Sequence, residues 1–163
     1  RDLIVTGVQT CALPISDFVQ FCFGRPQSVF SSGLSKFSGA IDHVVTQYVY
    51  ESGVAVMAEG SWLMVPKGGF NMAYTMHFEK ATVDFDLSRG PEALKLIVAG
   101  KLPRVIKPKG SDGYVGELRH MVDAIQAGQP PSVVTAQDGL SAVEICEAEE
   151  ASVKTGKVIT LAR

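Results

Sequence analysis

The sequence has little of what marks secreted, membrane-spanning or nucleic-acid-binding proteins. Its three cysteines are an odd number, are widely spaced and form no C-x-x-C pair, which argues against a disulfide framework and a thiolate zinc site. Its apolar runs are far shorter than the roughly 20 residues that cross a bilayer. Fifteen basic and 17 acidic residues leave a net charge of -2 without a basic stripe. We therefore expect no nucleic-acid partner, no membrane association, and reduced thiols in a cytoplasmic protein.

What is present is the composition of one ordinary globular domain. The chain has 163 residues, of which 46% are hydrophobic and 20% are charged. That length is sufficient to bury a hydrophobic core. The chain opens with Arg1 rather than Met, so we expect it to be a piece of a longer protein.

Residues 1–16 differ from the rest, because they carry no charge after Asp2 and show no sustained hydrophobic period. A signal peptide is one interpretation, but its apolar region is weak and is broken by Gln9. The first strand of a nucleotide-binding fold is a second, but no further glycine follows Gly7 in the required spacing. The third, which we favour, is a non-native leader, because the segment resembles translated sequencing-adapter read-through. We therefore predict residues 17–163 as the functional domain.

From Asp17 onward the hydrophobic periods predict a regular series of elements. A helix ends at Gly24, a hairpin turns at Gly53, and a capping box of Thr135 and Asp138 opens the last helix. Strands are predicted at 28–34, 43–50, 54–65, 71–78, 82–87, 94–98 and 158–161, and further helices at 114–127 and 135–155.

The pattern predicts the α+β class, a largely antiparallel open β-sheet with helices packed on one face. Period-two alternation, clearest at 71–78, is typical of antiparallel strands with one covered face. The last helix has a buried face of mostly small side chains: Ala142, Ile145, Cys146, Ala148 and Ser152. Glu149 lies on the same inner side, and nothing in the sequence accounts for it.

Four short motifs in a fixed order carry a family resemblance. They are Phe23-Gly24, Tyr114-x-x-Glu117-x-x-His120, Thr135-Ala136-Gln137-Asp138-Gly139-Leu140, and Glu147-Ala148 to Ser152-x-x-Thr155-Gly156-Lys157. Over residues 17–161 the chain resembles the C-terminal domain of the Gfo/Idh/MocA oxidoreductases, the relatives of glucose–fructose oxidoreductase and inositol dehydrogenase. The resemblance implies a parent protein with an N-terminal Rossmann domain that binds NAD or NADP. It also implies that the present domain supplies substrate contacts and the oligomer interface.

The chain departs from that family where the catalytic groups belong. The family has a lysine at the end of the Rossmann domain, followed by a D-x-x-x-H motif. By the resemblance, that histidine and aspartate correspond to Pro14 and Thr10, neither of which moves a hydroxyl proton near neutral pH. We therefore expect this fragment to contain no catalytic residue, no cofactor site and no activity of its own.

Five residues are candidate substrate contacts, and a structural alternative stands beside three of them. Asp17 touches substrate or caps its helix. Trp62, the only tryptophan, is a sugar-stacking platform or a core or interface aromatic. Phe70 and Asn71 begin a predicted strand at the place from which the family reaches toward its substrate. His120 is a ligand or a structural histidine.

The remaining titratable residues favour neither a metal site nor an acid–base pair. His43 and His77 are isolated, so no metal site is expected. Asp84 and Asp86 point to the same side of a predicted strand. With no acid–base partner in view, we interpret them as part of a solvated face.

Two classes of function remain open. The first is the substrate and oligomerisation half of an NAD(P)-dependent oxidoreductase acting on a sugar, a polyol or a related hydroxy compound. The second is a non-catalytic α+β binding or dimerisation module. In both, we expect a homo-oligomer through the open sheet face. Val44 and Tyr48 lie on one side of a strand and Val45 and Val49 on the other, and helices can cover only one side.

Overall fold

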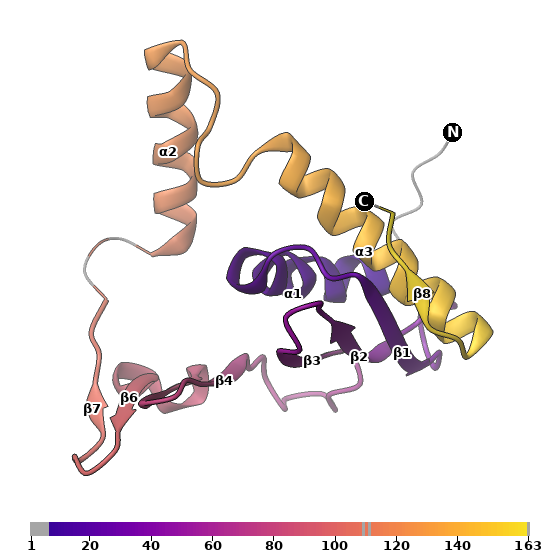
Figure 1. Ribbon diagram of the computed structural model, residues 1–163, viewed down its shortest axis with the longest axis horizontal. Coiled ribbons are helices and arrows are strands. Elements are labelled where there is room, and N and C mark those ends of the chain that lie inside the picture. The colour runs from indigo at the N-terminus through magenta and orange to yellow at the C-terminus, as the bar shows by residue number, and fades with distance from the viewer. Residues whose placement is uncertain (1–6, 109, 111, 163) are drawn as a thin grey trace. The chain divides into compact units, whose positions relative to one another are not determined.

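The computed structural model describes residues 7–108, 110 and 112–162, which form the elements shown in Figure 1. The chain divides into two compact units. Unit 1 is built from the chain up to Met64 and from Pro130 onward, and unit 2 comprises Val65–Gln129. Each unit contains one four-stranded antiparallel sheet.

The sheet of unit 1 has the strand order β3-β2-β1-β8. Its strands are β1 (Ser28–Leu34), β2 (His43–Val49), β3 (Ala55–Ser61) and β8 (Ile159–Thr160). The β2–β3 turn needs Gly53, whose φ of +75° lies in the left-handed region. The bounds of β1 match the prediction, whereas β3 ends at Ser61 rather than at residue 65.

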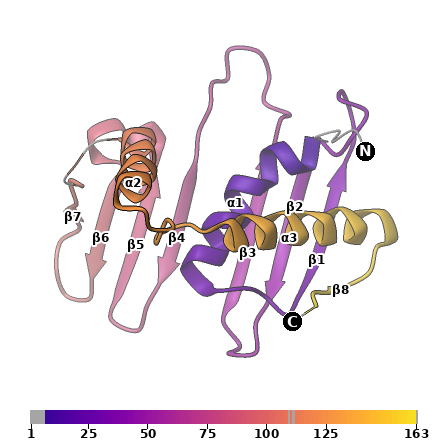
Figure 2. The ribbon, with the colours of Figure 1, turned by 90° about the horizontal axis from the view of Figure 1, so that it is seen from above.

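Two helices, α1 (Gly7–Phe23) and α3 (Ala136–Thr155), cross one face of this sheet, as Figure 2 shows. The side chains that face them are the buried ones, such as Val44, Thr46 and Tyr48 on β2. Because neighbouring residues of a strand point to opposite faces, Val45 and Val49 lie on the face without helices.

The structure corrects the predicted start of the first helix. Rather than beginning near Asp17, α1 runs from Gly7 through Pro14, so Asp17 lies in the helix interior and is not an N-cap. A proline inside a helix removes one backbone donor, but packing can outweigh this local penalty. Ala12 is 3% exposed and packs with Ile41 and Val44. Residues 1–6 of the predicted leader lie outside the described residues, and the foreign origin of 1–16 stays a prediction.

The capping box and the buried face predicted for α3 are confirmed. The Asp138 amide donates to Thr135 Oγ1 at 3.2 Å, and the Thr135 amide donates to Asp138 Oδ2 at 2.7 Å. The helix ends at Gly156, whose φ is +66°. The five residues assigned to the inner face are all buried: Ala142, Ile145, Cys146, Ala148 and Ser152.

Unit 2 is a four-stranded meander followed by a helix. Its sheet has the order β4-β5-β6-β7, formed by β4 (Ala73–His77), β5 (Ala81–Asp86), β6 (Leu94–Val98) and β7 (Arg104–Val105). A short 3₁₀ helix, η1 (Leu87–Glu92), separates β5 from β6. Because β4 begins at Ala73, Phe70 and Asn71 precede this strand rather than opening it as predicted.

Helix α2 (Gly113–Ala127) begins at the N-cap Asp112 and ends at Gly128, close to the predicted bounds. Its apolar face is not covered in unit 2, since Tyr114, Leu118 and Ile125 are 81%, 68% and 70% exposed. Only Ala124 of this helix is buried.

The α+β class with antiparallel strands and helices on one sheet face is confirmed, with the difference that the strands form two four-stranded sheets. The two units divide after Met64, where β3 has ended and an exposed segment leads to β4. In the described part of the chain, no helix is long and apolar enough to span a membrane.

Close packing of β1 on β2 gives the first testable prediction. A Cβ added at Gly33 would lie 2.5 Å from the His43 carbonyl oxygen, a backbone atom that cannot move freely. We expect Gly33→Ala to lower the free energy of unfolding by about 1–3 kcal/mol, measured by urea denaturation.

Gly139→Ala is the matched control, because nothing lies within 4 Å of its added Cβ inside α3. We expect it to raise the free energy of unfolding by about 0.5–1 kcal/mol, since alanine favours a helix interior. Equal stability of Gly33→Ala and the wild type would contradict the described pairing.

Candidate functional site

The five predicted substrate contacts are divided between the two units. Asp17 and Trp62 belong to unit 1, and Phe70, Asn71 and His120 belong to unit 2.

In unit 1, Asp17 and Trp62 differ in their surroundings. Asp17 is half-buried on α1, and its pKa is raised, first by burial and then by the nearby carboxylate of Asp138. The indole of Trp62 is 56% exposed just after β3, while its backbone amide donates to the Asp42 carbonyl at 2.8 Å. Trp62 is thus no core residue of unit 1, and its exposed ring is available for stacking.

In unit 2, the side chain of Phe70 is 79% exposed, and that of Asn71 is engaged by neighbouring residues. Asn71 Nδ2 donates to Asp86 Oδ1 at 3.1 Å, and Asn71 Oδ1 accepts from the Ser88 amide at 3.0 Å. Asn71 therefore holds the start of η1. His120 lies half-buried on α2.

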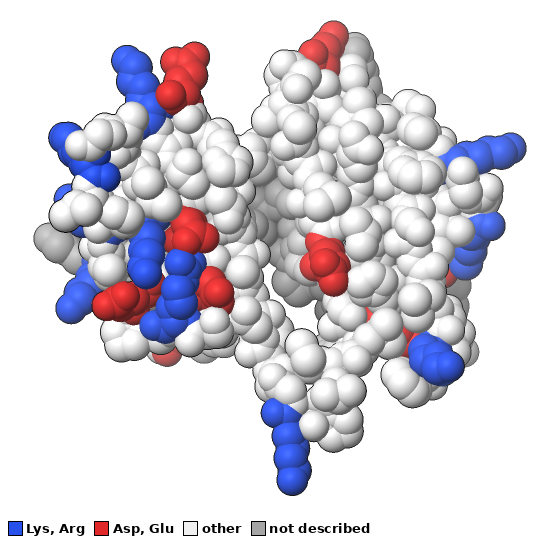
Figure 3. All heavy atoms as spheres, turned by 90° about the horizontal axis from the view of Figure 1, so that it is seen from below, with Lys and Arg blue, Asp and Glu red and all other residues white. Residues whose placement is uncertain are grey.

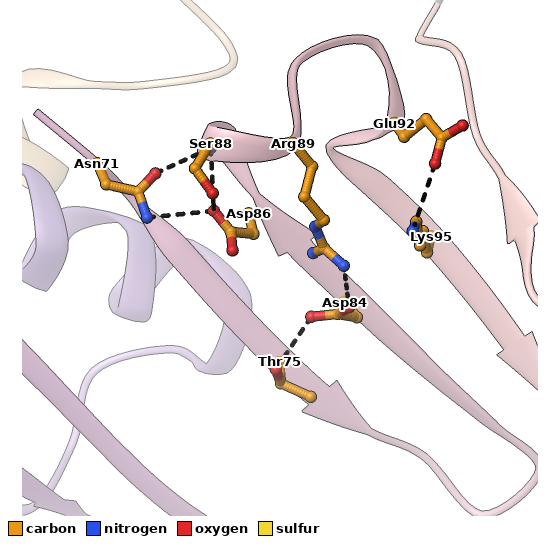
Figure 4. Close-up of polar contacts among 8 residues, drawn as sticks. All are labelled: Asn71, Thr75, Asp84, Asp86, Ser88, Arg89, Glu92 and Lys95. Carbon is orange, nitrogen blue, oxygen red and sulfur yellow. Dashed lines mark hydrogen bonds and ion pairs between the residues drawn. The ribbon is translucent and has the colours of Figure 1, made fainter.

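A polar cluster occupies one face of the sheet in unit 2 (Figure 4). The antiparallel register places Asp84 opposite Thr75, and alternation brings Asp86 to the same face. Arg89 reaches back from η1, so that its Nη1 donates to Asp84 Oδ2 at 2.6 Å. Asp86 Oδ1 accepts from the Ser88 amide at 2.9 Å and caps η1.

The electrostatics of this cluster do not suit proton transfer. The hydrogen bond from Arg89 lowers the pKa of Asp84, and the bonds from Ser88 and Asn71 lower the pKa of Asp86. Both carboxyl groups are thus ionised near neutral pH, and neither can serve as a general acid. The interpretation of a merely solvated face is incomplete, because both side chains are half-buried and bonded.

The guanidinium of Arg89 has two further hydrogen-bond donors besides the one that binds Asp84. Its Nε and Nη2 atoms are buried and lack an acceptor among the described residues. These two donors form the edge with which arginine binds a carboxylate or a phosphate in bidentate geometry.

Each unit also carries an open depression. In unit 2, a mostly apolar one of about 500 Å³ lies beside the stacked rings of Tyr74 and Phe85, whose centroids are 5.1 Å apart. In unit 1, a more polar groove of about 820 Å³ lies where α1 ends and α3 begins. Arg25 borders this groove and pairs with Glu144 at 2.8 Å.

Within the described ranges, no three His, Cys, Asp or Glu side chains lie close enough together to bind a metal ion. Sequence reasoning missed Arg89 and Arg25. The motif carrying Arg89 is a strand end followed by a Gly-Pro turn, which does not reveal that the chain folds back onto Asp84. No local signal could have found the Arg25 contact, because Glu144 lies far along the sequence.

The Asp84–Arg89 pair gives the second prediction. We expect the Asp84 carboxyl to titrate below its ordinary pKa of 3.8, and carbon-13 NMR of that carboxyl measures the titration. The pair stabilises the fold above pH 3.8, and this contribution is lost as the pH falls through the lowered folded-state pKa.

Arg89→Gln should return the pKa of Asp84 toward 3.8, whereas Lys95→Gln, opposite Asp84 on β6, should leave it low. An unchanged Asp84 titration in Arg89→Gln would refute the pairing.

No protein-family model and no curated protein matches the chain. Solved structures do match it. An aldose–aldose oxidoreductase from Caulobacter crescentus, complexed with glycerol, aligns with a TM-score of 0.78 and 18% identity over 95% of this chain and 47% of its own. A levoglucosan dehydrogenase in complex with NADH and levoglucosan aligns with a TM-score of 0.78 and 15% identity, over 96% of this chain and 50% of its own.

The WlbA dehydrogenase from Bordetella pertussis, in complex with NADH and UDP-GlcNAcA, aligns with a TM-score of 0.71 and 18% identity, over 93% of this chain and 45% of its own. The chain thus spans about half the length of the structures it matches. These neighbours are Gfo/Idh/MocA-type oxidoreductases, so the resemblance seen in the motifs is confirmed at the level of the fold. The chain has the α+β fold found in about half of each of these oxidoreductases.

Proposed function

We propose that this chain is the substrate-binding and oligomerisation half of an NAD(P)-dependent oxidoreductase that acts on a sugar, a polyol or a related hydroxy compound. The observation that carries the proposal is the structural match, which covers 96% of this chain but only 50% of a dehydrogenase holding NADH and a sugar derivative. A cytoplasmic location accords with this function and with the free thiols of Cys22 and Cys146.

In the proposed reaction, a hydride passes between a carbon of the substrate and the nicotinamide, and the hydroxyl proton passes to a base of the other half. The resemblance implies that the other half, which this chain lacks, supplies the Rossmann fold, the lysine and the D-x-x-x-H histidine. Pro14 and Thr10 stand where the histidine and aspartate of that motif belong. The present chain alone is accordingly inactive and has no cofactor of its own.

Among the five predicted contacts, the exposed aromatic rings have the most direct support. Trp62 and Phe70 are 56% and 79% exposed, and a flat ring can stack on the apolar face of a sugar. Asn71 contributes by fixing η1 and the Asp86 carboxylate beside it. Asp17 and His120 are the remaining proposed contacts, one on α1 and one on α2.

The proposed oligomer forms through the face of the unit 1 sheet that lacks helices. This face, called the open face below, presents Phe30, Val45, Val49 and Met57, of which Met57 is 73% exposed. Figure 3 views the chain from the side opposite to Figure 2, and few charged side chains lie under β1, β2 and β3. A two-fold pairing of this face with its copy is the commonest way to cover such a surface.

Activity of the full-length gene product tests the proposed function. We expect the full-length protein to reduce NAD or NADP with at least one sugar or polyol. The absorbance of the reduced nicotinamide measures this reaction. The 163-residue chain alone should give no turnover, and calorimetric titration should show no NADH binding.

Turnover or micromolar nucleotide binding by the chain alone would contradict this division of labour. A full-length product without a nucleotide-binding fold would favour the non-catalytic binding or dimerisation module instead.

Light scattering tests the proposed interface. We expect the average mass of the wild-type chain to exceed that of a monomer at micromolar concentration and to fall on dilution. Met57→Arg places a positive charge on the open face, at the edge strand β3, and should give a monomer. Gln137→Arg, on the helix side of unit 1, is the control and should associate like the wild type. A sharp monomer mass for the wild type, unchanged by dilution, would overturn the proposal.

A further inference from the structure

A carboxyl group is buried where α1, α3 and β2 meet inside unit 1. Glu149 of α3 has an exposed fraction of 0%. Tyr48 of β2 donates its hydroxyl to Glu149 Oε1 at 2.7 Å, and Ser16 of α1 donates its hydroxyl to the same oxygen at 3.0 Å. These three residues, called the Glu149 cluster below, join three elements through one oxygen atom.

The second oxygen of this carboxyl group is unmatched. Glu149 Oε2 is buried and has no hydrogen-bond partner in the described part of the chain. None of the ion pairs found among the described residues includes Glu149. A negative charge here would have two hydroxyl donors on one side and no cation to balance it.

The groups that face Glu149 from the surrounding elements do not supply a positive charge either. β2 contributes the Tyr48 phenol, whose pKa is raised far above its ordinary 10.0 by burial, and α3 itself contributes the Cys146 thiol. α1 contributes the uncharged Ser16. The neighbouring Asp17 is an acid, and the nearby carboxylate of Asp138 repels its ionised form. The core side chains from β1 and β3 carry no charge; they include Val29, Ser31 and Val56.

Burying an ionised carboxylate without a partner is far more costly than burying its neutral form. The two hydroxyl donors stabilise the anion in part, but burial is the larger effect and raises the pKa of Glu149 above its ordinary 4.5. The neutral acid keeps both hydrogen bonds to Oε1, because a carbonyl oxygen accepts as well.

We propose that Glu149 is protonated in the folded protein and that the Glu149 cluster is a proton-dependent latch, which holds α1 on α3 and β2. Removing the proton places a charge without a neighbouring cation in the core and lowers the stability of the folded unit 1. Asp17 follows Ser16 directly on α1, so the latch also sets the position of that residue. The latch rests on the geometry of this chain, in which Ser16 is the last residue of the predicted leader 1–16, and it does not depend on the proposed oxidoreductase function.

The sign of the pH dependence follows from the direction of the shift. The stabilisation by Glu149 is fully present below the unfolded-state value of about 4.5 and is lost as the pH rises through the higher folded-state pKa. Between these two values the folded state binds one proton more than the unfolded state. The unfolding equilibrium constant should therefore rise by about tenfold per pH unit in that interval.

Urea unfolding of the full chain between pH 5 and 9, at one fixed chain concentration, tests the latch. We expect the unfolding constant of the wild type to rise with pH relative to that of Glu149→Gln, which keeps the shape of the side chain and cannot ionise. Glu147→Gln, an exposed position on the same helix, should follow the wild type. Parallel curves for the wild type and Glu149→Gln would overturn the proposal.

Tyr48→Phe provides a second variant in case Glu149→Gln does not fold. Tyr48 stabilises the ionised form of Glu149, so its removal should move the Glu149 titration to higher pH, whereas a purely structural role would lower stability equally at every pH. Carbon-13 NMR of the Glu149 carboxyl in the wild type reads the same event directly. Titration at or below pH 4.5 would contradict the latch, and titration well above it would support it.

Discussion

Tyr48, Ser16 and Glu149 come from three different elements, and Ser16 and Glu149 are separated by 133 positions in the sequence. Their hydrogen bonds constrain the helices of unit 1 as apolar packing alone cannot, because a bond requires one distance and one direction. α1 and α3 lie on the face of the sheet that carries Tyr48, and no described element of unit 1 covers the opposite face. The open face, with Phe30, Val49 and Met57, is the direct consequence.

In unit 2, polar contacts join the side chains on one face of the sheet. Asp84 is bound by Arg89, and Asp86 is bound by Asn71 and Ser88, so the turn between β5 and β6 is fixed from the sheet surface. The carboxylates of Asp84 and Asp86 are thus already hydrogen-bonded within the fold. In the proposed function, the groups that act on a substrate hydroxyl come from another part of the protein.

Elements with local signals were predictable from the sequence, and those decided by distant contacts were not. The capping box of Thr135 and Asp138 and the strand 28–34 depend on neighbours in the chain, and both are found as predicted. Pro14 is locally a helix breaker, yet α1 continues through it because Ala12 and Ser16 pack inside unit 1.

The candidate site was less predictable than the fold. Asn71 has alternating neighbours that extend the strand pattern backward, but its amide is engaged with Asp86 and Ser88 across the sheet edge. Glu149 had no explanation at all, since its partners lie on β2 and α1.

A continuous sequencing read through the codons of Ser16 and Asp17 into the upstream gene tests the central claim, that this fold is half of an NAD(P)-dependent oxidoreductase. The account predicts a D-x-x-x-H motif shortly before Asp17, preceded by a strand–turn–helix with G-x-G-x-x-G spacing. A read that retains residues 1–16 and continues upstream without a nucleotide-binding fold would contradict it.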